Sequence, residues 1–248
     1  MSDRDVERGG PPPLRGVHLA AGAWRALQAN WRALWPVGLG YAVFTVASEQ
    51  VARAAELTTP APTAAFLAYG FITGLVGALL SGLTLRIVLT PGGRRGRLDG
   101  PLVAYVLLVT VVGLTANLAM GLTTQAMPGD AAAAADPGAA AGQTFLVLLA
   151  MIAGLWIWLR LTLWPVGMVL GDRAMKPSRS FRLMRRGVWG VIMGSLILGF
   201  GPLLVYLTLA IQAREHGPIA LVIAAPFLAF FAMATAAVQA EAYRARVG

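Results

Sequence analysis

An arginine inside a long apolar run is the residue of this sequence best suited to bind a charged group. Arg160 stands in the stretch LWIWLRLTLW at 155–164, and a charge within a membrane is costly enough that such residues often serve a function. One hypothesis is that Arg160, together with Arg86 in the same leaflet, binds an anionic lipid or another ligand that carries a phosphate. The alternative is that Arg160 extends its long side chain to the lipid headgroups, since Trp164 marks an interface about one turn further on.

Two basic segments have the pattern of helices that lie in a membrane interface. In AWRALQANWRALW at 23–35, large apolar side chains recur at helical spacing and arginines share another face, and SRSFRLMRRGVW at 178–189 has the same pattern. Such helices place arginines beside anionic headgroups; the alternative is that these are ordinary solvent-facing sides of helical loops. The predicted basic face contains Arg25, Arg32, Arg179, Arg182 and Arg186.

Small residues at helical spacing predict close contacts between helices. Gly113, Asn117 and Gly121 follow one another at intervals of four residues, and Gly190 and Gly194 do so in a later apolar run. Small side chains let helix backbones approach each other, and a polar side chain among them adds a hydrogen bond. We expect these residues to form packing surfaces rather than a path for ions.

Prolines inside two apolar runs are the pattern expected of a transporter with broken helices. Gly199–Pro202 and Pro226 each lie within such a run, and broken helices build the ion sites of many transporters. No acidic residue adjoins either position, which weakens the case for a proton-coupled or cation-coupled transporter.

The sequence lacks the residue clusters that most enzymes and metal sites need. It has no cysteine and two histidines, and His18 and His216 are predicted on opposite sides of the membrane. No group of His and carboxylate residues has the spacing of metal ligands, and GGRRGR lacks the Lys-Ser/Thr ending of a phosphate-binding loop. We therefore expect no enzyme, no metal and no cofactor.

Composition indicates that the candidate residues are positioned by helices that cross a membrane. Of the 248 residues, 57% are hydrophobic and 12% are charged, and the mean hydropathy is +0.68, whereas soluble domains carry about 25% charged residues. We expect an all-α, polytopic membrane helix bundle in residues 16–248, after a disordered cytoplasmic tail at 1–15. Apolar runs of roughly the 20 residues that a bilayer requires predict about six transmembrane helices, near 34–52, 64–89, 101–127, 144–168, 188–212 and 218–240.

The basic residues determine the predicted orientation. With the N-terminus in the cytoplasm, all of the 20 Lys and Arg residues except Arg53 and Arg214 fall on the cytoplasmic side, as expected for an inner-membrane protein with both termini inside. This topology explains the net charge of +9, so we expect no nucleic-acid partner. The carboxylate at the edge of an apolar run, Glu49, falls near the outer face and is too far from Arg160 to pair with it.

The pentapeptide LWPVG occurs at 34–38 and again at 163–167. Both copies are predicted at the cytoplasmic face, but the chain passes through them in opposite directions, which does not fit an inverted-repeat transporter. We interpret the motif as an interfacial tryptophan anchor with a backbone break at proline. Chance repetition in so biased a composition is the alternative.

Three segments carry a resemblance to a bacterial family. Arg160 and Pro165 match an Arg and a Pro at the end of one span, SFRLMRRGVW at 180–189 is similar to the form Ser-Trp-x-Leu-Thr-Arg-Gly-Asn-x-Trp, and NWRALWPVGLGY at 30–41 is similar to a first span. Together they resemble six-helix proteins akin to the membrane domain of glycerophosphoryl diester phosphodiesterases. The departures from the form are Phe181, Met184, Arg186 and Gly187. The resemblance implies a six-span module without the catalytic domain, and hence without phosphodiesterase activity.

These observations favour a non-enzymatic integral protein of the bacterial inner membrane that acts as a lipid-interacting or scaffold module. Its expected partners are membrane lipids, anionic ones above all, and another membrane protein or a second copy of the chain. A small transporter or channel is the alternative function.

Overall fold

The computed structural model describes residues 13–55, 63–90, 98–126, 137–216 and 218–247. All regular secondary structure in these ranges is α-helical. No strand occurs in these ranges, so the predicted all-α class is confirmed. The helices are α2 (Gly16–Ala29), α3 (Trp31–Ala54), α4 (Ala64–Leu89), α5 (Gly100–Ala126), α7 (Pro137–Leu161), α8 (Leu163–Leu170), α9 (Pro177–Leu183), α10 (Val188–His216) and α11 (Pro218–Val247).

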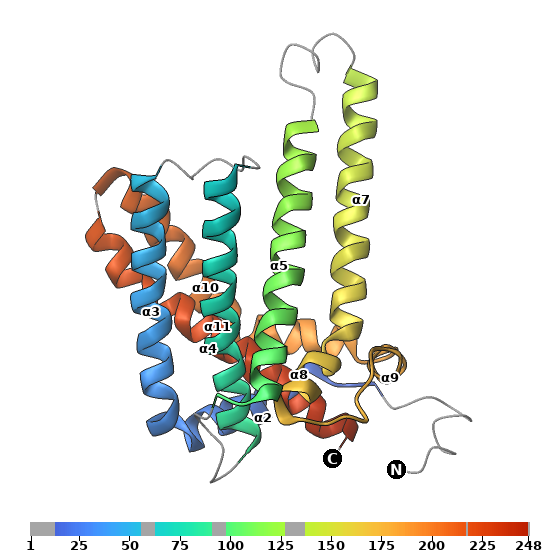
Figure 1. Ribbon diagram of the computed structural model, residues 1–248. Coiled ribbons are helices and arrows are strands. Elements are labelled where there is room, and N and C mark those ends of the chain that lie inside the picture. Colours follow the sequence, from blue (N-terminus) through green and yellow to red (C-terminus); the bar gives the residue numbers. More distant parts are fainter. Residues whose placement is uncertain (1–12, 56–62, 91–97, 127–136, 217, 248) are drawn as a thin grey trace.

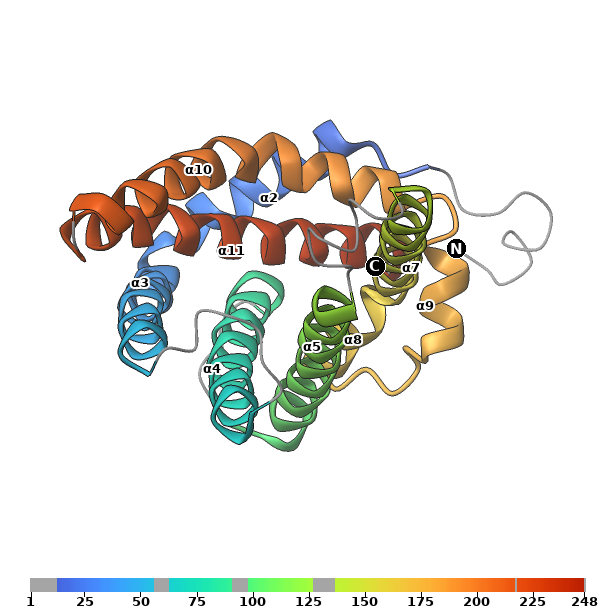
Figure 2. The ribbon, with the colours of Figure 1, turned by 90° about the horizontal axis from the view of Figure 1, so that it is seen from above.

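Four long helices stand side by side and two cross them at a slant. In Figure 1, α3, α4, α5 and α7 run roughly upright, while α10 and α11 descend obliquely. Figure 2, seen from above, shows the upright helices end-on and the α10–α11 pair extended behind them. These two helices are the longest of the described chain, with 29 and 30 residues, and a helix longer than the bilayer is thick fits by tilting.

Four helical segments are long and apolar enough to cross a membrane. They are Ala64–Leu89, Thr144–Leu170, Val188–Ala213 and Ile219–Val247, of which Thr144–Leu170 comprises most of α7 together with the short α8. The predicted first span forms α3, but its composition does not reach this level, and the described part of α5 contributes a shorter apolar helix, Gly100–Ala116. The six-span topology therefore remains a prediction, whereas four membrane-length helices are present.

The helices that were expected to break at proline do not break. Pro202 lies inside α10 and Pro226 inside α11, and both helices continue through these positions. Each proline removes one backbone donor and can kink a helix, but the backbone does not unwind into the irregular segment that a transporter ion site needs. The prediction of broken helices near Gly199–Pro202 and Pro226 is wrong.

The second LWPVG copy is where the chain does break. Pro165 has no N–H to donate to the carbonyl of Leu161, and its ring clashes with that carbonyl in an unbroken helix. The chain turns at Thr162, α7 ends, and α8 begins as a short separate helix. In Figure 1, α8 lies across the lower end of the bundle instead of continuing α7.

The protein core is concentrated at one end of the bundle. We call this end, formed by α2, α8, α9, the last turns of α4 and α11 and the first turns of α5 and α10, the basic end. Buried side chains gather there on α8 and on the alanine-rich C-terminal half of α11, and small alanines let neighbouring helices approach closely. The far half of α7 is exposed. Of the apolar window in Thr144–Leu170, 11% is buried inside the protein, whereas the corresponding share for α4 is 39%.

The N-terminal segment lies against this core. Residues 1–12 of the predicted disordered tail lie outside the described residues. Leu14, however, donates its backbone N–H to the carbonyl of Arg186 over 3.4 Å, and its carbonyl lies against Gly190. The folded part therefore begins before residue 16. The chain then bends at Asn30, so that α2 lies crosswise to α3 (Figure 1).

Candidate functional site at the basic end

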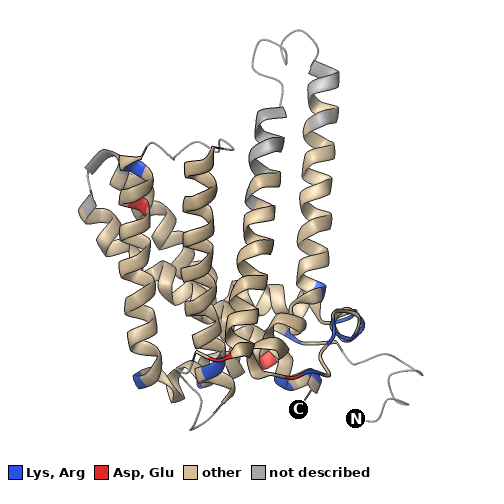
Figure 3. Cartoon of the chain, viewed as in Figure 1, with Lys and Arg blue, Asp and Glu red and all other residues tan. Residues whose placement is uncertain are grey.

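Charged side chains gather at the basic end. Figure 3 shows the described Lys, Arg, Asp and Glu residues there, apart from a pair at the C-terminal end of α3, which is Glu49 and Arg53. The C-terminal end of α11 lies at the basic end too. Most of the long exposed helix surface above it is apolar, so the molecule has one strongly basic face at the end of an apolar bundle.

Arg86 is a structural residue. Its side chain is 4% exposed. It forms an ion pair with Asp99, and its Nε and Nη2 donate to the carbonyl oxygen of Val169 over 3.1 and 3.0 Å. The arginine at the end of α4 thus fastens the loop before α5 and the last turn of α8. Asp99 and Val169 already engage this guanidinium, which gives Arg86 a structural role, and the binding of one ligand by Arg86 and Arg160 stays a prediction.

Arg160 has a different environment. Its guanidinium carbon lies 4.2 Å from the centroid of the Phe181 ring, and its carbonyl accepts a 2.9 Å hydrogen bond from the hydroxyl of the buried Ser180. These contacts join the end of α7 to α9. The buried Nε has no hydrogen-bond partner among the described residues, and a buried donor left unpaired costs about 1–3 kcal/mol.

The arginines of the predicted basic face are divided among several elements. Arg25 lies on α2 and Arg32 on α3, Arg179 and Arg182 lie on α9, and Arg186 lies in the turn before α10. Helices α2 and α9 each bury one side: Leu27 and Leu183 lie in the core. The arginines of these two helices lie on the remaining sides. Arg25, Arg32, Arg182 and Arg186 are exposed and Arg179 is half-buried.

The loop between α8 and α9 is held in place by its own sequence. Gly171 adopts a left-handed φ of 75°, and the N–H groups of Gly171 and Asp172 donate to the carbonyls of Met168 and Gly167 over 3.0 and 2.9 Å. This is the Schellman ending, which favours glycine because a side chain is strained at positive φ. The Asp172 carboxylate then accepts from the N–H of Ala174 over 2.9 Å.

The same carboxylate joins the loop to the last helix. The hydroxyl of Tyr243 on α11 donates to Asp172 Oδ2 over 2.6 Å. Arg244, the next residue, donates to the carbonyl of Val88 at the end of α4 and to Glu241. No local sequence pattern pairs Asp172 with Tyr243; the GD pair directly after an apolar run is the available signal of a helix ending.

A cavity of about 880 Å³ opens beside this loop. Its charged and apolar lining includes Arg86, Asp99, Trp164, Met168, Arg173 and Lys176. Arg160 does not line it. The basic end therefore has two separate groups of basic side chains, one around Arg160 and one at the α8–α9 loop.

The glycines predicted to pack against other helices do so on α10 but not at Gly113 of α5. An added Cβ at Gly190 would meet the carbonyl oxygen of Leu14, and at Gly194 it would lie 3.3 Å from the carbonyl oxygen of Gly16. Both glycines thus lie at the close crossing of α2 and α10. An added Cβ at Gly113 meets no atom within 4 Å, so among the described residues Gly113 lies at no such contact, contrary to expectation. Asn117 and Gly121 belong to α5, but their surroundings lie outside the described set.

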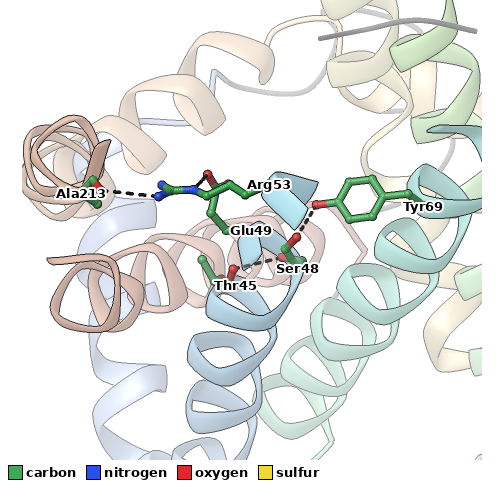
Figure 4. A network of polar contacts seen from close by, with 6 residues as sticks. All are labelled: Thr45, Ser48, Glu49, Arg53, Tyr69 and Ala213. Carbon is green, nitrogen blue, oxygen red and sulfur yellow. Dashed lines mark hydrogen bonds and ion pairs between the residues drawn. The ribbon is translucent and has the colours of Figure 1, made fainter. Parts of the chain in front are cut away.

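A second polar network lies at the opposite end of α3 (Figure 4). Arg53 Nε lies 3.0 Å from Glu49 Oε1, and its Nη1 donates to the carbonyl of Ala213 on α10 over 3.5 Å. Tyr69 on α4 donates to the carbonyl of Ser48 over 3.1 Å. These contacts connect α3 to its neighbours, and they provide Glu49 with a partner on its own helix.

Neither metal ligands nor relatives point to an activity. In the part of the chain that the structure describes, no group of three or more His, Cys, Asp or Glu side chains is placed to hold a metal ion. Comparison with protein-family models, with curated proteins and with solved structures finds no match.

Proposed function

We propose that this chain is a non-enzymatic integral protein of the bacterial inner membrane that binds anionic, phosphate-bearing lipids at its basic end. In this proposal both termini are cytoplasmic and the basic end lies at the inner leaflet. The observation that carries it is the guanidinium of Arg160, stacked on Phe181 with a buried Nε that has no partner among the described residues.

The environment of Arg160 suits an anion better than it suits a purely structural arginine. Arg86, the structural arginine of the same end, has a carboxylate and a carbonyl as partners. Arg160 has an aromatic ring, which orients the guanidinium plane and attracts its charge but accepts no strong hydrogen bond. Phosphate oxygens fit the planar fork of an arginine, so a lipid headgroup is a suitable partner for this guanidinium.

Neighbouring features support a lipid in this place. Arg179 and Arg182 of α9 flank Phe181 in sequence, and Trp156 and Trp189 pack edge to face with ring centroids 6.1 Å apart. Tryptophan favours the headgroup level of a bilayer, and clustered basic residues there attract acidic lipids. The resemblance of these segments to the membrane domain of glycerophosphoryl diester phosphodiesterases is in keeping with a lipid-related module.

Native mass spectrometry of the gently extracted protein tests the proposal. We compare the wild type with Arg160→Gln and with the matched control Arg185→Gln. The control also removes one arginine charge, but from an exposed position in the turn between α9 and α10. We expect a phospholipid adduct on the wild type and the control that is lost from Arg160→Gln. Equal adducts on all three proteins would show that Arg160 serves only to join α7 to α9.

The transporter alternative depended on broken helices. Since α10 and α11 are continuous through Pro202 and Pro226, no described feature favours a transporter. If a protein subunit, and no lipid, stays bound to the wild type in the mass spectrometer, the result would favour a function as a scaffold for another membrane protein.

A further inference from the structure

We propose that the cavity beside the α8–α9 loop is a second, specific binding site for a phosphate group attached to an apolar body. The inference is independent of Arg160, because that residue does not line the cavity. It adds a defined site and a ligand class to the general basic face.

Two of the cationic side chains that line the cavity have no partner in the described part of the chain. Asp99 is engaged by Arg86 and by the N–H of Leu102 over 3.2 Å, and Asp172 is engaged by Tyr243. Arg173 and Lys176 are exposed, and within the described chain their side chains have no hydrogen-bond or ion-pair partner. The Tyr243 hydroxyl is neutral and leaves Asp172 its charge, so the lining holds three cations, Arg86, Arg173 and Lys176, against two carboxylates. This excess of positive charge favours an anionic ligand.

The loop presents these two cations in a fixed arrangement. The left-handed Gly171 turns the chain out of α8, the Asp172–Tyr243 hydrogen bond fastens the turn to α11, and Met175 packs into the core at 3% exposure. Arg173 and Lys176 thus project from anchored backbone. A site held by its own scaffold loses less conformational entropy when it binds a ligand.

The remaining wall of the cavity indicates what the anion is attached to. Trp164, Met168 and Met175 line it together with the ring of Pro101. A free inorganic ion gains nothing from such a wall, whereas the glycerol and upper acyl carbons of a phospholipid bury apolar surface against it. Phosphate suits Arg173 and Lys176, since arginine and lysine are both common phosphate binders. The shared chemistry is phosphate, and an acidic phospholipid is the source that the apolar wall favours.

Isothermal titration calorimetry on the full-length protein in a nonionic detergent tests the site. The probes are dihexanoyl phosphatidylglycerol, dihexanoyl phosphatidylcholine and inorganic phosphate. The test variant is Arg173→Gln/Lys176→Gln, and the matched control is Arg15→Gln/Arg185→Gln, which removes two exposed charges that lie outside both the cavity and the predicted basic face. Thermal denaturation of each variant confirms that it is folded.

We expect the wild type to bind phosphatidylglycerol at one site, with an affinity at least tenfold lower in the test variant and unchanged in the control. Trp164→Ala distinguishes the two sources of phosphate. It should lower the affinity for phosphatidylglycerol and leave the affinity for inorganic phosphate unchanged. Binding of inorganic phosphate with the same dependence on Arg173 and Lys176 would support the site with a free-phosphate ligand. Equal losses in both double variants, or equal binding of phosphatidylcholine, would overturn it.

The Arg160→Gln variant separates this inference from the proposed function. If it loses its lipid adduct but binds phosphatidylglycerol in the calorimeter normally, the two sites are distinct. If the adduct is unaffected and the test variant still loses binding, the cavity is the lipid site and the proposal for Arg160 fails alone.

Discussion

The hydroxyl of Tyr243 donates a 2.6 Å hydrogen bond to the carboxylate of Asp172, across 71 positions of the chain. Tyr243 lies in the last helix, and Asp172 begins the loop after α8. The same carboxylate caps the N–H of Ala174. One side chain therefore fixes both the local turn and its attachment to α11, which makes the position of the α8–α9 loop depend on the C-terminal helix.

Replacing Tyr243 with Phe should loosen this loop without disturbing the helix packing. The ring is 7% exposed and the substitution retains it, so the loss is that of a hydrogen bond to a charged group, about 1.5 kcal/mol. We expect the melting temperature in detergent to fall by a few degrees and the amides of residues 173–176 to exchange faster. Unchanged exchange in these residues would show that the glycine turn alone holds the loop.

The helices themselves could be predicted from the sequence because their signals are local. Long apolar runs, bounded by proline and glycine, gave ranges that differ by a few residues from α4, α5 and α10. The backbone break that LWPVG predicts is present at the second copy, where α7 ends and α8 begins, but not at the first, where α3 continues through Pro36. An apolar run that contains one proline reads as one span, and whether the helix kinks or ends depends on what the second part packs against.

The site was less predictable, since its contacts connect distant segments. Arg86 and Arg160 have the same residue type and similar apolar surroundings in sequence, yet one is paired with Asp99 and the other stacks on Phe181. The difference lies in the tertiary structure, which brings the loop before α5 to Arg86. The Asp172–Tyr243 bond has no local signature for the same reason. Helical periodicity over 23–35 and 178–189 likewise did not reveal that each segment is divided between two helices.

Two glycines of α10 offer a test of the predicted close packing. Gly190→Ala places a methyl group against the carbonyl oxygen of Leu14, while Gly201→Ala meets no atom within 4 Å. Forcing a methyl group into a packed contact costs about 1–3 kcal/mol, so Gly190→Ala should lower the melting temperature. Gly201→Ala should raise it slightly, because alanine favours a helix interior by about 0.5–1 kcal/mol over glycine. Equal shifts would contradict the close crossing of α2 and α10.

The ion pair of Arg86 predicts a stability defect rather than a binding defect. Arg86→Met removes one partner of a buried pair and should cost about 3–5 kcal/mol, because the carboxylate of Asp99 loses its counter-charge. The double variant Arg86→Met/Asp99→Asn should be less destabilised than the single variant, as the asparagine keeps an oxygen for the N–H of Leu102. Unfolding in mixed micelles measures both.

The outcome that would contradict this assignment is specific. If Arg86→Met is as stable as the wild type and instead loses a bound phospholipid in native mass spectrometry, Arg86 is a ligand-binding residue. The Arg160→Gln variant serves as the comparison, because it should show the converse behaviour of retained stability and lost lipid.

The two copies of LWPVG provide the last prediction, since their final glycines face different obstacles. In both copies the leucine is fully buried, Leu34 and Leu163 alike. An added Cβ at Gly167 would lie 2.5 Å from Met175 Cβ, close to the backbone of the α8–α9 loop. At Gly38 the nearest atom is 3.0 Å away, and it is Cε at the free end of the Met233 side chain.

A flexible side-chain end can move aside, but a Cβ cannot move without its backbone. Gly38→Ala should therefore be close to neutral, whereas Gly167→Ala should displace Met175, lower the melting temperature and speed amide exchange in residues 171–176. It should also weaken phosphatidylglycerol binding at the cavity, because Arg173 and Lys176 lie on the displaced loop. Equal effects of the two substitutions would mean that the repeated pentapeptide has the same role in both places, and that the α8–α9 loop is not held by the glycine of the second copy.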